Sequence, residues 1–367
     1  MRLWVCCFVV SLEANFSFIA FGDWGENRAD FQSVVAQLHR ESRPEFVALL
    51  GDNFYPKGLK SVSDPQLELF DEFSGISNKF FVILGNHDYG YAESCAAHIE
   101  YGQINSKWLM PSNYYSKIYS IGDNGVQLCM LFLDTHVFEP DQLAWMHEVL
   151  QNNCQYENMF RLVFAHYPLY TAGIYKDSSS VVRLRSKIAS LLVKYHVHAY
   201  VSGHEHQMQA IEVEGVHFLV SGAVAQMNRR KSFDNSGMKK ELKFFDDESP
   251  GFLRFRFLDN KDLRKVRLSY DFVSAKGGKV KYTNALQLTV ATTTTTTTRK
   301  PPPTSTTSGS KGTTCSTASD HVQTPQSEGE PKSTDVNVGE TTKASSSSSP
   351  LWVKWVVSAA ALIYVCS

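Results

Sequence analysis

The chain lacks an excess of charge of either sign. Its 367 residues carry 36 lysines and arginines against 37 aspartates and glutamates, which gives a formal net charge of -1. Binding to nucleic acid or to an anionic membrane surface through the overall field of a protein requires a clear positive surplus. We therefore do not expect nucleic acid among the partners of this protein.

Cysteine is also scarce, and its spacing matches no zinc-finger pattern, so we assign no metal to the thiols. Of seven cysteines, Cys6, Cys7 and Cys366 lie near the two ends and Cys315 lies in a low-complexity region. Three remain in the globular part, namely Cys95, Cys129 and Cys154. In an exported protein one disulfide can form among these three, which leaves one free thiol. The spacing leaves open which two would pair.

No long uninterrupted apolar run marks a clear transmembrane helix. Residues 1–14, "MRLWVCCFVVSLEA", place one arginine before eight apolar residues and then small or polar ones. This layout is typical of a secretory signal peptide, and the run is too short to span a bilayer. A buried first strand is the alternative interpretation, but "FSFIAFGD" directly afterwards already supplies such a strand.

The region 291–345 has few apolar residues and is dominated by threonine, serine and proline. Such a composition cannot bury enough surface to offset its ordering entropy, so we expect an extended stalk whose hydroxyls suit O-glycosylation. Residues 346–367 end in "LWVKWVVSAAALIYVCS", and small residues, a polar spacer and an apolar tail form a GPI-anchor signal. A C-terminal membrane helix is the alternative, although 17 residues that include Lys354 are marginal for a span.

Residues 15–290 have the alternation of strands and helices that is typical of an α/β fold. Segments with helical spacing, such as "DFQSVVAQLHR" and "DQLAWMHEVLQNN", lie between several apolar runs. After Gln207 the pattern changes to strands joined by turns, which indicates antiparallel additions. The apolar runs are "FSFIAFGD", "EFVALLGD", "KFFVILGN", "VQLCMLFLD", "MFRLVFAH" and "VHAYVSGH".

Each of these six runs ends in a polar residue that could bind metal or phosphate. In open α/β sheets, ligands bind beyond the carboxyl ends of the strands. One such residue would be explained by a turn, but turns do not require His and Asn at the same topological place. The residues are Asp23, Asp52, Asn86, Asp134, His166 and His204.

Seven side chains in the motifs at these strand ends form a candidate set of metal ligands. Carboxylate, phenolate, amide oxygen and imidazole suit iron, zinc or manganese and do not suit soft copper-type sites. Seven ligands fit two metals that share one carboxylate, and two ions about 3.5–4 Å apart are a recurrent solution for phosphate ester hydrolysis. The set is Asp23, Asp52, Tyr55, Asn86, His166, His204 and His206.

The order of the motifs carries a family resemblance. Asp-x-Gly, Gly-Asp-x-x-Tyr, Gly-Asn-His-Asp, Val-x-x-His and Gly-His-x-His follow one another, and "NSKWLMPSNYY", "FLDT", "DQLAWM", "HYPLY" and "GVHFLVSGA" extend the likeness. Over residues 16–290 the chain resembles the purple acid phosphatases, above all the animal-type tartrate-resistant acid phosphatases, within the calcineurin-like metallophosphoesterase superfamily. This resemblance implies an α/β (α+β) fold, a four-layer αββα sandwich of two mixed sheets.

The resemblance also implies a reaction and its cofactors. Asp23, Asp52, Tyr55 and His206 would hold a ferric ion, and Asp52, Asn86, His166 and His204 would hold a divalent iron, zinc or manganese, with Asp52 bridging the two. The protein would be an acid phosphatase that hydrolyses phosphate monoesters through metal-activated hydroxide. A trivalent ion depresses the pKa of bound water further than a divalent ion does, so hydroxide would persist at acidic pH.

Residues beside the ligands are expected to act on the substrate. His87 would donate a hydrogen bond to phosphate or a proton to the leaving oxygen, beside Asn86, and Asp88 would orient His87. Where family members commonly carry glutamate and a second phosphate-facing histidine, this chain has Ile174 and Tyr175. Tyr175 could donate a hydrogen bond to phosphate, but a phenol titrates near pH 10 and is a poor acid at pH 5.

The expected substrates are phosphoproteins or small organic phosphates, and the expected place is the cell surface or an endosomal or lysosomal membrane, through a GPI anchor. Two other functions are compatible with the same fold. One is a membrane scaffold with weak or absent catalysis, which should have lost metal ligands, whereas all seven are present here. The other is a phosphodiesterase or nucleotidase, since side chains outside the metal shell decide that specificity.

Overall fold

The structure is a computed structural model that describes residues 16–121, 125–228, 238–258, 266–288, 307–309 and 315. All of these belong to one compact unit within residues 1–318. The predicted signal peptide (1–14) and anchor signal (346–367) lie outside the described residues. Across the described part of the chain, no helix combines the length and apolar character needed to cross a bilayer.

The first of two sheets has seven strands in the order β14-β13-β12-β1-β2-β3-β4. Strands β1 to β4 run parallel to one another, and β12, β13 and β14 add to the β1 edge in antiparallel fashion. The strands span Ser17–Phe21 (β1), Phe46–Leu50 (β2), Phe80–Ile83 (β3), Trp108–Leu109 (β4), Gly251–Leu258 (β12), Arg267–Ser274 (β13) and Val280–Gln287 (β14).

The second sheet has eight strands in the order β11-β9-β10-β8-β7-β6-β5-β15. Its centre, β10-β8-β7-β6, is parallel, and the outer strands pair antiparallel. The strands span Tyr115–Ile121 (β5), Val126–Phe132 (β6), Met159–Ala165 (β7), Ala199–Ser202 (β8), Met208–Val213 (β9), Val216–Ser221 (β10), Leu242–Asp246 (β11) and Thr307–Gly309 (β15).

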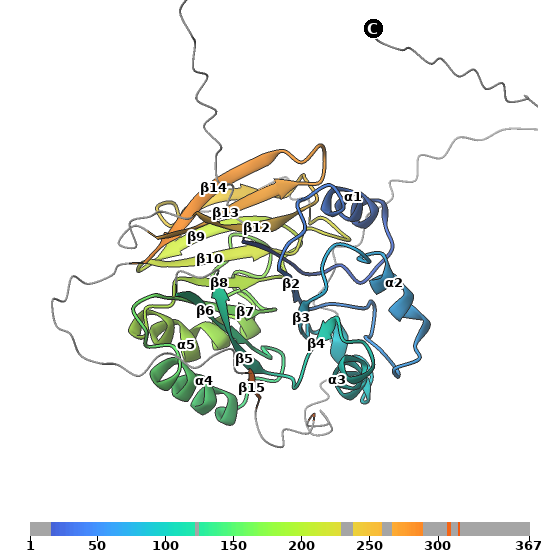
Figure 1. Ribbon diagram of the computed structural model, residues 1–367, viewed down its shortest axis with the longest axis horizontal. Helices are drawn as coiled ribbons and strands as arrows, with labels where there is room; N and C mark the ends of the chain where they lie inside the picture. The colour runs from blue at the N-terminus through green and yellow to red at the C-terminus, as the bar shows by residue number, and fades with distance from the viewer. Residues whose placement is uncertain are drawn as a thin grey trace, which may run out of the picture. The chain divides into compact units, whose positions relative to one another are not determined.

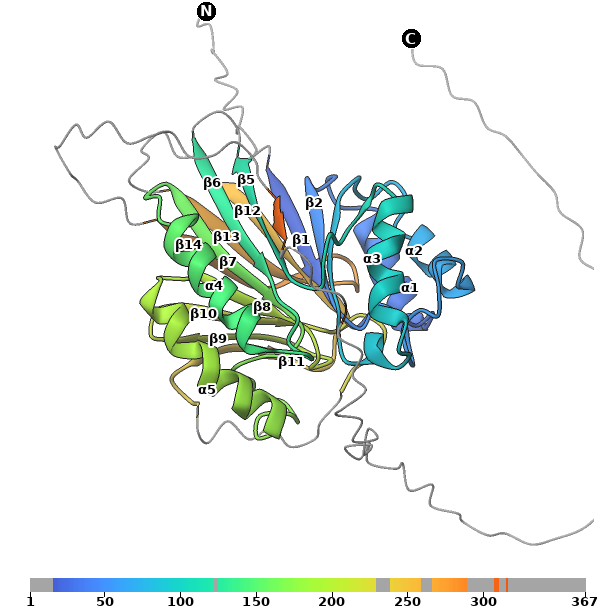
Figure 2. The same ribbon diagram turned by 90° about the horizontal axis from the view of Figure 1, so that it is seen from below.

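Helices cover the outer faces of both sheets, so the molecule has the four αββα layers that the family resemblance implied (Figure 1). Seen from below, α1, α2 and α3 flank the first sheet and α4 and α5 flank the second (Figure 2). The helices span Ala29–Leu38 (α1), Glu68–Asp71 (α2), Ser94–Ile104 (α3), Pro140–Asn152 (α4) and Ser179–Lys194 (α5), with short 3-10 turns at Pro65–Leu67 and His87–Tyr89.

Aromatic side chains fill the space between the two sheets. Phe81 of β3 stacks on Phe132 of β6 with ring centroids 5.2 Å apart, and Phe132 stacks on Phe164 of β7 at 5.0 Å. Phe18 of β1 meets Phe164 edge to face at 6.4 Å. Buried aromatic rings contribute large apolar areas, so this layer holds the sheets face to face. It thereby brings the ends of β1 to β3 next to the ends of β7 and β8.

The six apolar runs of the sequence are strands β1, β2, β3, β6, β7 and β8, as predicted. The expected antiparallel additions after Gln207 are also present, beginning with the β9–β10 hairpin. The sequence pattern does not indicate α3, whose apolar residues show no helical stripe, or β5, in which Lys117 and Ser120 interrupt the apolar pattern. Both elements depend on long-range packing.

Two disulfides correct the expectation of a free thiol. Cys129 of β6 pairs with Cys154, and Cys95 of α3 pairs with Cys315, 220 residues away. Cys315 and strand β15, which pairs with β5, both fall in the region 291–345 that we expected to be an extended stalk. At residues 307–309 strand pairing holds the chain to the sandwich, and at Cys315 a disulfide does so. The structure differs there from the expected extended stalk.

The pairing makes a testable prediction. Peptide mapping without reduction should find Cys95 linked to Cys315 and Cys129 linked to Cys154. Cys315→Ser should create one thiol on Cys95 that reacts in denaturant, because its partner is gone, while the Cys129–Cys154 link persists. A Cys95–Cys129 or Cys95–Cys154 peptide in the wild-type protein would show the pairing to be wrong.

Candidate metal centre

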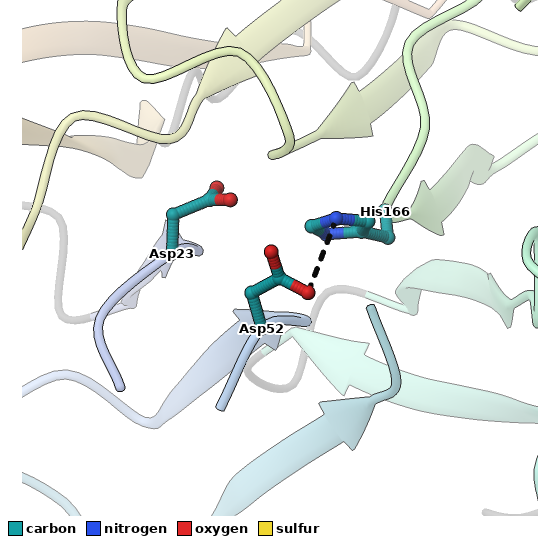
Figure 3. Close-up of side chains that lie close together, drawn as sticks. All are labelled: Asp23, Asp52 and His166. Carbon is teal, nitrogen blue, oxygen red and sulfur yellow. Dashed lines mark ion pairs between the residues drawn. The ribbon is translucent and has the colours of Figure 1, made fainter. Parts of the chain in front are cut away.

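The seven predicted ligands stand on loops that follow five strands. Asp23 follows β1, Asp52 and Tyr55 follow β2, and Asn86 follows β3, all in the first sheet; His166 follows β7, and His204 and His206 follow β8, in the second. Because the strands are neighbours and the sheets face each other, the loops meet at one end of the sandwich. Figure 3 shows the side chains of Asp23, Asp52 and His166 converging from three of these loops.

Three of the ligands have a left-handed backbone conformation, with positive φ, which non-glycine residues rarely adopt. Asp23, Asp52 and His204 have φ values of 59°, 52° and 67°. Among the described residues they are three of five non-glycine residues with positive φ. Such strain costs on the order of 1–3 kcal/mol per residue and persists where the surrounding structure fixes it, commonly at functional sites.

The hydroxyl of Tyr55 joins the first group of ligands. It lies 3.2 Å from Asp52 Oδ2, 3.3 Å from His206 Nε2 and 3.4 Å from Asp23 Oδ1. His206 Nε2 is itself 3.4 Å from Asp23 Oδ1. Oxygen and nitrogen atoms of these four side chains thus lie close together around the Tyr55 hydroxyl, although Asp23 and His206 are more than 180 residues apart in the sequence.

His166 joins the second group. Its Nε2 lies 3.1 Å from Asn86 Oδ1 and 3.5 Å from Asp52 Oδ1, and its ring centroid is 5.1 Å from that of His204. Its Nδ1 is 2.8 Å from the carbonyl oxygen of Leu50. Since a carbonyl oxygen can only accept, Nδ1 carries the proton and Nε2 offers its lone pair to the group, as metal-binding histidines commonly do.

Asp52 belongs to both groups because its two carboxylate oxygens face different neighbours. Oδ2 meets Tyr55, while Oδ1 faces His166 and accepts a hydrogen bond from the backbone N–H of His87 at 2.9 Å. Gly85 makes this placement possible, since a Cβ atom there would lie 2.1 Å from Asp52 Oδ1. The arrangement is the one that a bridging carboxylate requires.

The electrostatics of the site favour bound cations. Burial raises the pKa of the Asp52 carboxyl; the nearby His166 opposes this, and the charge of Asp23 adds to it. Burial, followed by the charges of Asp52 and Asp23, holds the pKa of Tyr55 well above its usual range. Burial and the neighbouring histidines hold the pKa of His204 well below its usual range. Burying like charges close together costs free energy, and bound cations would offset that cost.

Oxygen and nitrogen atoms of Asp23, Asp52 and His166 lie within 4.8 Å of one another, and these residues are buried. The remaining predicted ligands, Tyr55, Asn86, His204 and His206, add phenol, amide and imidazole groups around them. This donor set fits iron, zinc or manganese. The residues present therefore fit a pair of metal ions.

Asp88 has a different task from the expected one of orienting His87. It is fully buried and accepts hydrogen bonds from the backbone N–H groups of Asn53, Phe54 and Gly85, at 2.9–3.2 Å, and from the Asn53 side chain. It also lies 3.4 Å from His98 Nε2. Asp88 therefore ties the loop that carries Asp52 and Tyr55 to the loop that carries Asn86 and His87.

His87 is oriented by a backbone carbonyl. Its Nδ1 lies 2.8 Å from the carbonyl oxygen of Pro56, and its ring packs edge to face on Tyr55 at 4.6 Å. Its Nε2 is 4.0 Å from Asp52 Oδ2, and the side chain is 39% exposed. His87 thus lies beside the shared carboxylate and is open to a substrate from solvent.

Tyr175 also joins the site. Its ring stacks on that of His204, with centroids 4.3 Å apart and planes at 29°. Tyr167 meets the same histidine edge to face at 4.5 Å. The structure therefore brings together all the residues that the sequence suggested as ligands or substrate contacts. Asp134, which ends strand β6, instead accepts from Tyr89 and Asn113, and burial raises its pKa to about 6.

Sequence reasoning missed three polar residues around the site. Asn53, in "GDNFY", accepts from Trp24 Nε1 and donates to Asp88 and to the Ile83 carbonyl. Glu205, in "GHEH", is fully buried and accepts a hydrogen bond from the backbone N–H of Tyr175. His136 lies 3.0 Å from the Tyr167 hydroxyl. Asn53 and Glu205 stand between predicted ligands within their motifs, and this position in the sequence could have indicated that they lie close to the site.

Comparison with known proteins agrees with this geometry. A model of the family described as "Calcineurin-like phosphoesterase" matches residues 16–208. The tartrate-resistant acid phosphatase type 5 of Oryctolagus cuniculus is 29% identical over 241 residues, which are 56% of this chain and 72% of that protein. Purple acid phosphatase 17 of Arabidopsis thaliana is 27% identical over 279 residues, 67% of this chain and 78% of that protein.

Solved structures show the same fold. The Plasmodium protein described as "GAP50 the anchor in the inner membrane complex" superposes with a TM-score of 0.63 at 24% identity, over 75% of this chain and 90% of that one. A purple acid phosphatase from yellow lupin (Lupinus luteus) seeds gives a TM-score of 0.51 at 15% identity, over 74% of this chain and 53% of that one.

The role of Asp88 makes a prediction about stability. Asp88→Ala should lower the free energy of unfolding by about 3–5 kcal/mol, because it leaves several buried N–H groups without their acceptor and His98 without its ion-pair partner. Asp64→Ala is a matched control, since Asp64 accepts hydrogen bonds from the backbone N–H groups of Lys60 and Gln66 within one short turn, and its loss should cost about 1–2 kcal/mol. Urea unfolding followed by circular dichroism measures both, and equal losses would contradict the role.

Proposed function

Because this chain belongs to the calcineurin-like phosphoesterase family, we propose that it is an acid phosphatase that hydrolyses phosphate monoesters at a dinuclear metal centre. One observation carries the proposal: the Tyr55 hydroxyl meets Asp23, Asp52 and His206 at 3.2–3.4 Å. A phenol in a carboxylate and imidazole group is suited to a trivalent ion. The names of the curated relatives, tartrate-resistant and purple acid phosphatases, support the same activity.

Two sets of residues would hold the metals. Asp23, Asp52, Tyr55 and His206 are suited to a ferric ion, and Asp52, Asn86, His166 and His204 to a divalent iron, zinc or manganese. When bound, such ions supply Lewis acidity, which polarises a phosphoryl oxygen and lowers the pKa of water.

His87 is the residue of this chain placed to move a proton. With Nδ1–H donated to the Pro56 carbonyl, the neutral ring has no proton on Nε2. The imidazolium form of the ring carries a proton on Nε2 as well. The Nε2–H can then donate to a phosphate oxygen or to the leaving oxygen, beside Asp52. Tyr175 and Asn86 would complete the contacts to phosphate.

His87→Ala should lower kcat for p-nitrophenyl phosphate by about 10²- to 10⁴-fold, since a positioned proton donor contributes that much. Metal content should stay at the wild-type value, because His87 is not in either ligand set. Initial rates between pH 4 and 8 and metal analysis measure both. His39→Ala, which removes an exposed histidine on the Glu72 carbonyl, is the control and should keep full activity. Equal rates in the two variants would remove His87 from the mechanism.

The wild-type protein tests the proposed function as a whole. We expect faster turnover of monoesters than of diesters or nucleotides at acidic pH, with phosphoproteins and small organic phosphates as the substrate classes. Preference for a diester or nucleotide would replace the monoesterase by a phosphodiesterase or nucleotidase. Absence of turnover with metals bound would favour a membrane scaffold, the second function that the likeness to the Plasmodium anchor protein brings in.

The sequence of both ends supports a place in the secretory pathway, at the cell surface or an endosomal or lysosomal membrane, with a GPI anchor. Residues 1–14 have the layout of a signal peptide, and residues 346–367 that of an anchor signal. Phosphatidylinositol-specific phospholipase C should therefore release the protein from intact cells into the medium. Retention in the membrane after treatment would indicate a C-terminal membrane helix instead.

A further inference from the structure

Glu205 stands between His204 and His206, and its carboxylate serves a neighbouring loop. Glu205 Oε1 accepts from the Tyr175 backbone N–H at 2.8 Å and from the Thr171 hydroxyl at 3.1 Å. Glu205 Oε2 accepts from the Ile174 backbone N–H at 3.2 Å. The side chain is fully buried. Both oxygens of a buried carboxylate are thus used to hold the loop 171–175.

The loop fits closely around this carboxylate. A Cβ atom on Gly173 would lie 2.3 Å from the carboxylate of Glu205, so a larger residue would push the two apart. The Gly173 N–H donates to Thr171 Oγ1, and the Ala172 N–H donates to Gln209 Oε1, both at 2.9 Å. Every backbone N–H from residue 172 to 175 therefore has an acceptor, and these hydrogen bonds stabilise the observed conformation of the loop.

The same loop places Tyr175 on the site. The ring of Tyr175 covers one face of His204 at 4.3 Å, and His204 directly precedes Glu205 in the chain. One short segment thus supplies a candidate metal ligand and the acceptor that fixes the tyrosine stacked on it. Any shift of the loop would move Tyr175 relative to His204.

We propose that Glu205 is a positioning residue that fixes Tyr175 over His204. It thereby determines the position of the tyrosine side chain that faces the substrate on this side of the site. The substrate consequence rests on the proposed function. A fixed loop presents the Tyr175 hydroxyl without a further ordering cost when substrate binds, so its main effect is on affinity. A glutamate that served only the fold would instead affect stability and metal binding.

Glu205→Gln tests the proposal with little change of shape. One of the two acceptor oxygens becomes an amide group that donates, so it faces the loop N–H groups without a bond. Amide exchange at Ile174 and Tyr175 should become about tenfold faster, because the two hydrogen bonds weaken. The KM for p-nitrophenyl phosphate should rise about tenfold, with kcat within about threefold and metal content unchanged. Glu212→Gln, on β9, makes the same change outside the loop and should alter none of these values.

A double variant shows whether Glu205 acts through Tyr175. In a Tyr175→Ala background, Glu205→Gln should raise KM by less than about twofold, because the positioned group is gone. Equal effects of Glu205→Gln in both backgrounds would overturn the proposal. Unchanged amide exchange in Glu205→Gln, or loss of metal together with stability, would overturn it as well.

A second variant serves if Glu205→Gln fails to fold. Thr171→Val keeps the carboxylate but removes one donor to Glu205 and the acceptor of the Gly173 N–H, and it should give a smaller rise in KM with the same direction in amide exchange at Ile174 and Tyr175. No change in either quantity would contradict the proposal. The exchange measurement does not depend on turnover: if the wild-type protein hydrolyses no monoester, the proposed function fails, while exchange at residues 174 and 175 still decides whether Glu205 holds the loop.

Discussion

The candidate site depends on the contacts that the Asp52 carboxylate makes with both groups of ligands. One oxygen meets Tyr55 and the other faces His166, so the first and second groups of ligands share a single side chain. The residue is 2% exposed and has a positive φ. Burial of the charge is unfavourable for an isolated aspartate, and bound cations would offset it. The strained backbone persists because the surrounding structure fixes it.

The fold supplies this arrangement by packing two sheets face to face through aromatic side chains. Loops from neighbouring parallel strands then meet loops from the other sheet, which places residues from Asp23 to His206 around one point. A second layer of polar contacts keeps the loops in place. Asp88 joins two loops of the first sheet, and Glu205 joins a loop of the second sheet to the ligand segment that contains it.

Much of this could be predicted from the sequence because it is local. The strands are continuous apolar runs, and the ligands stand in short motifs directly after them. The remaining features depend on approaches between distant segments. Cys95 finds Cys315 across 220 residues, and Asp88 turns toward Asn53 although it stands beside His87. Adjacency in the sequence suggested the wrong partner for Asp88, because in this short turn neighbouring side chains contact different surroundings.

Anomalous diffraction from crystals of the native protein, recorded at the iron, zinc and manganese edges, tests the central claim most directly. The account predicts two metal peaks about 3.5–4 Å apart, both in contact with Asp52. One peak should also touch Tyr55 and the other His166. A single peak, or two peaks of which neither touches Asp52, would contradict it.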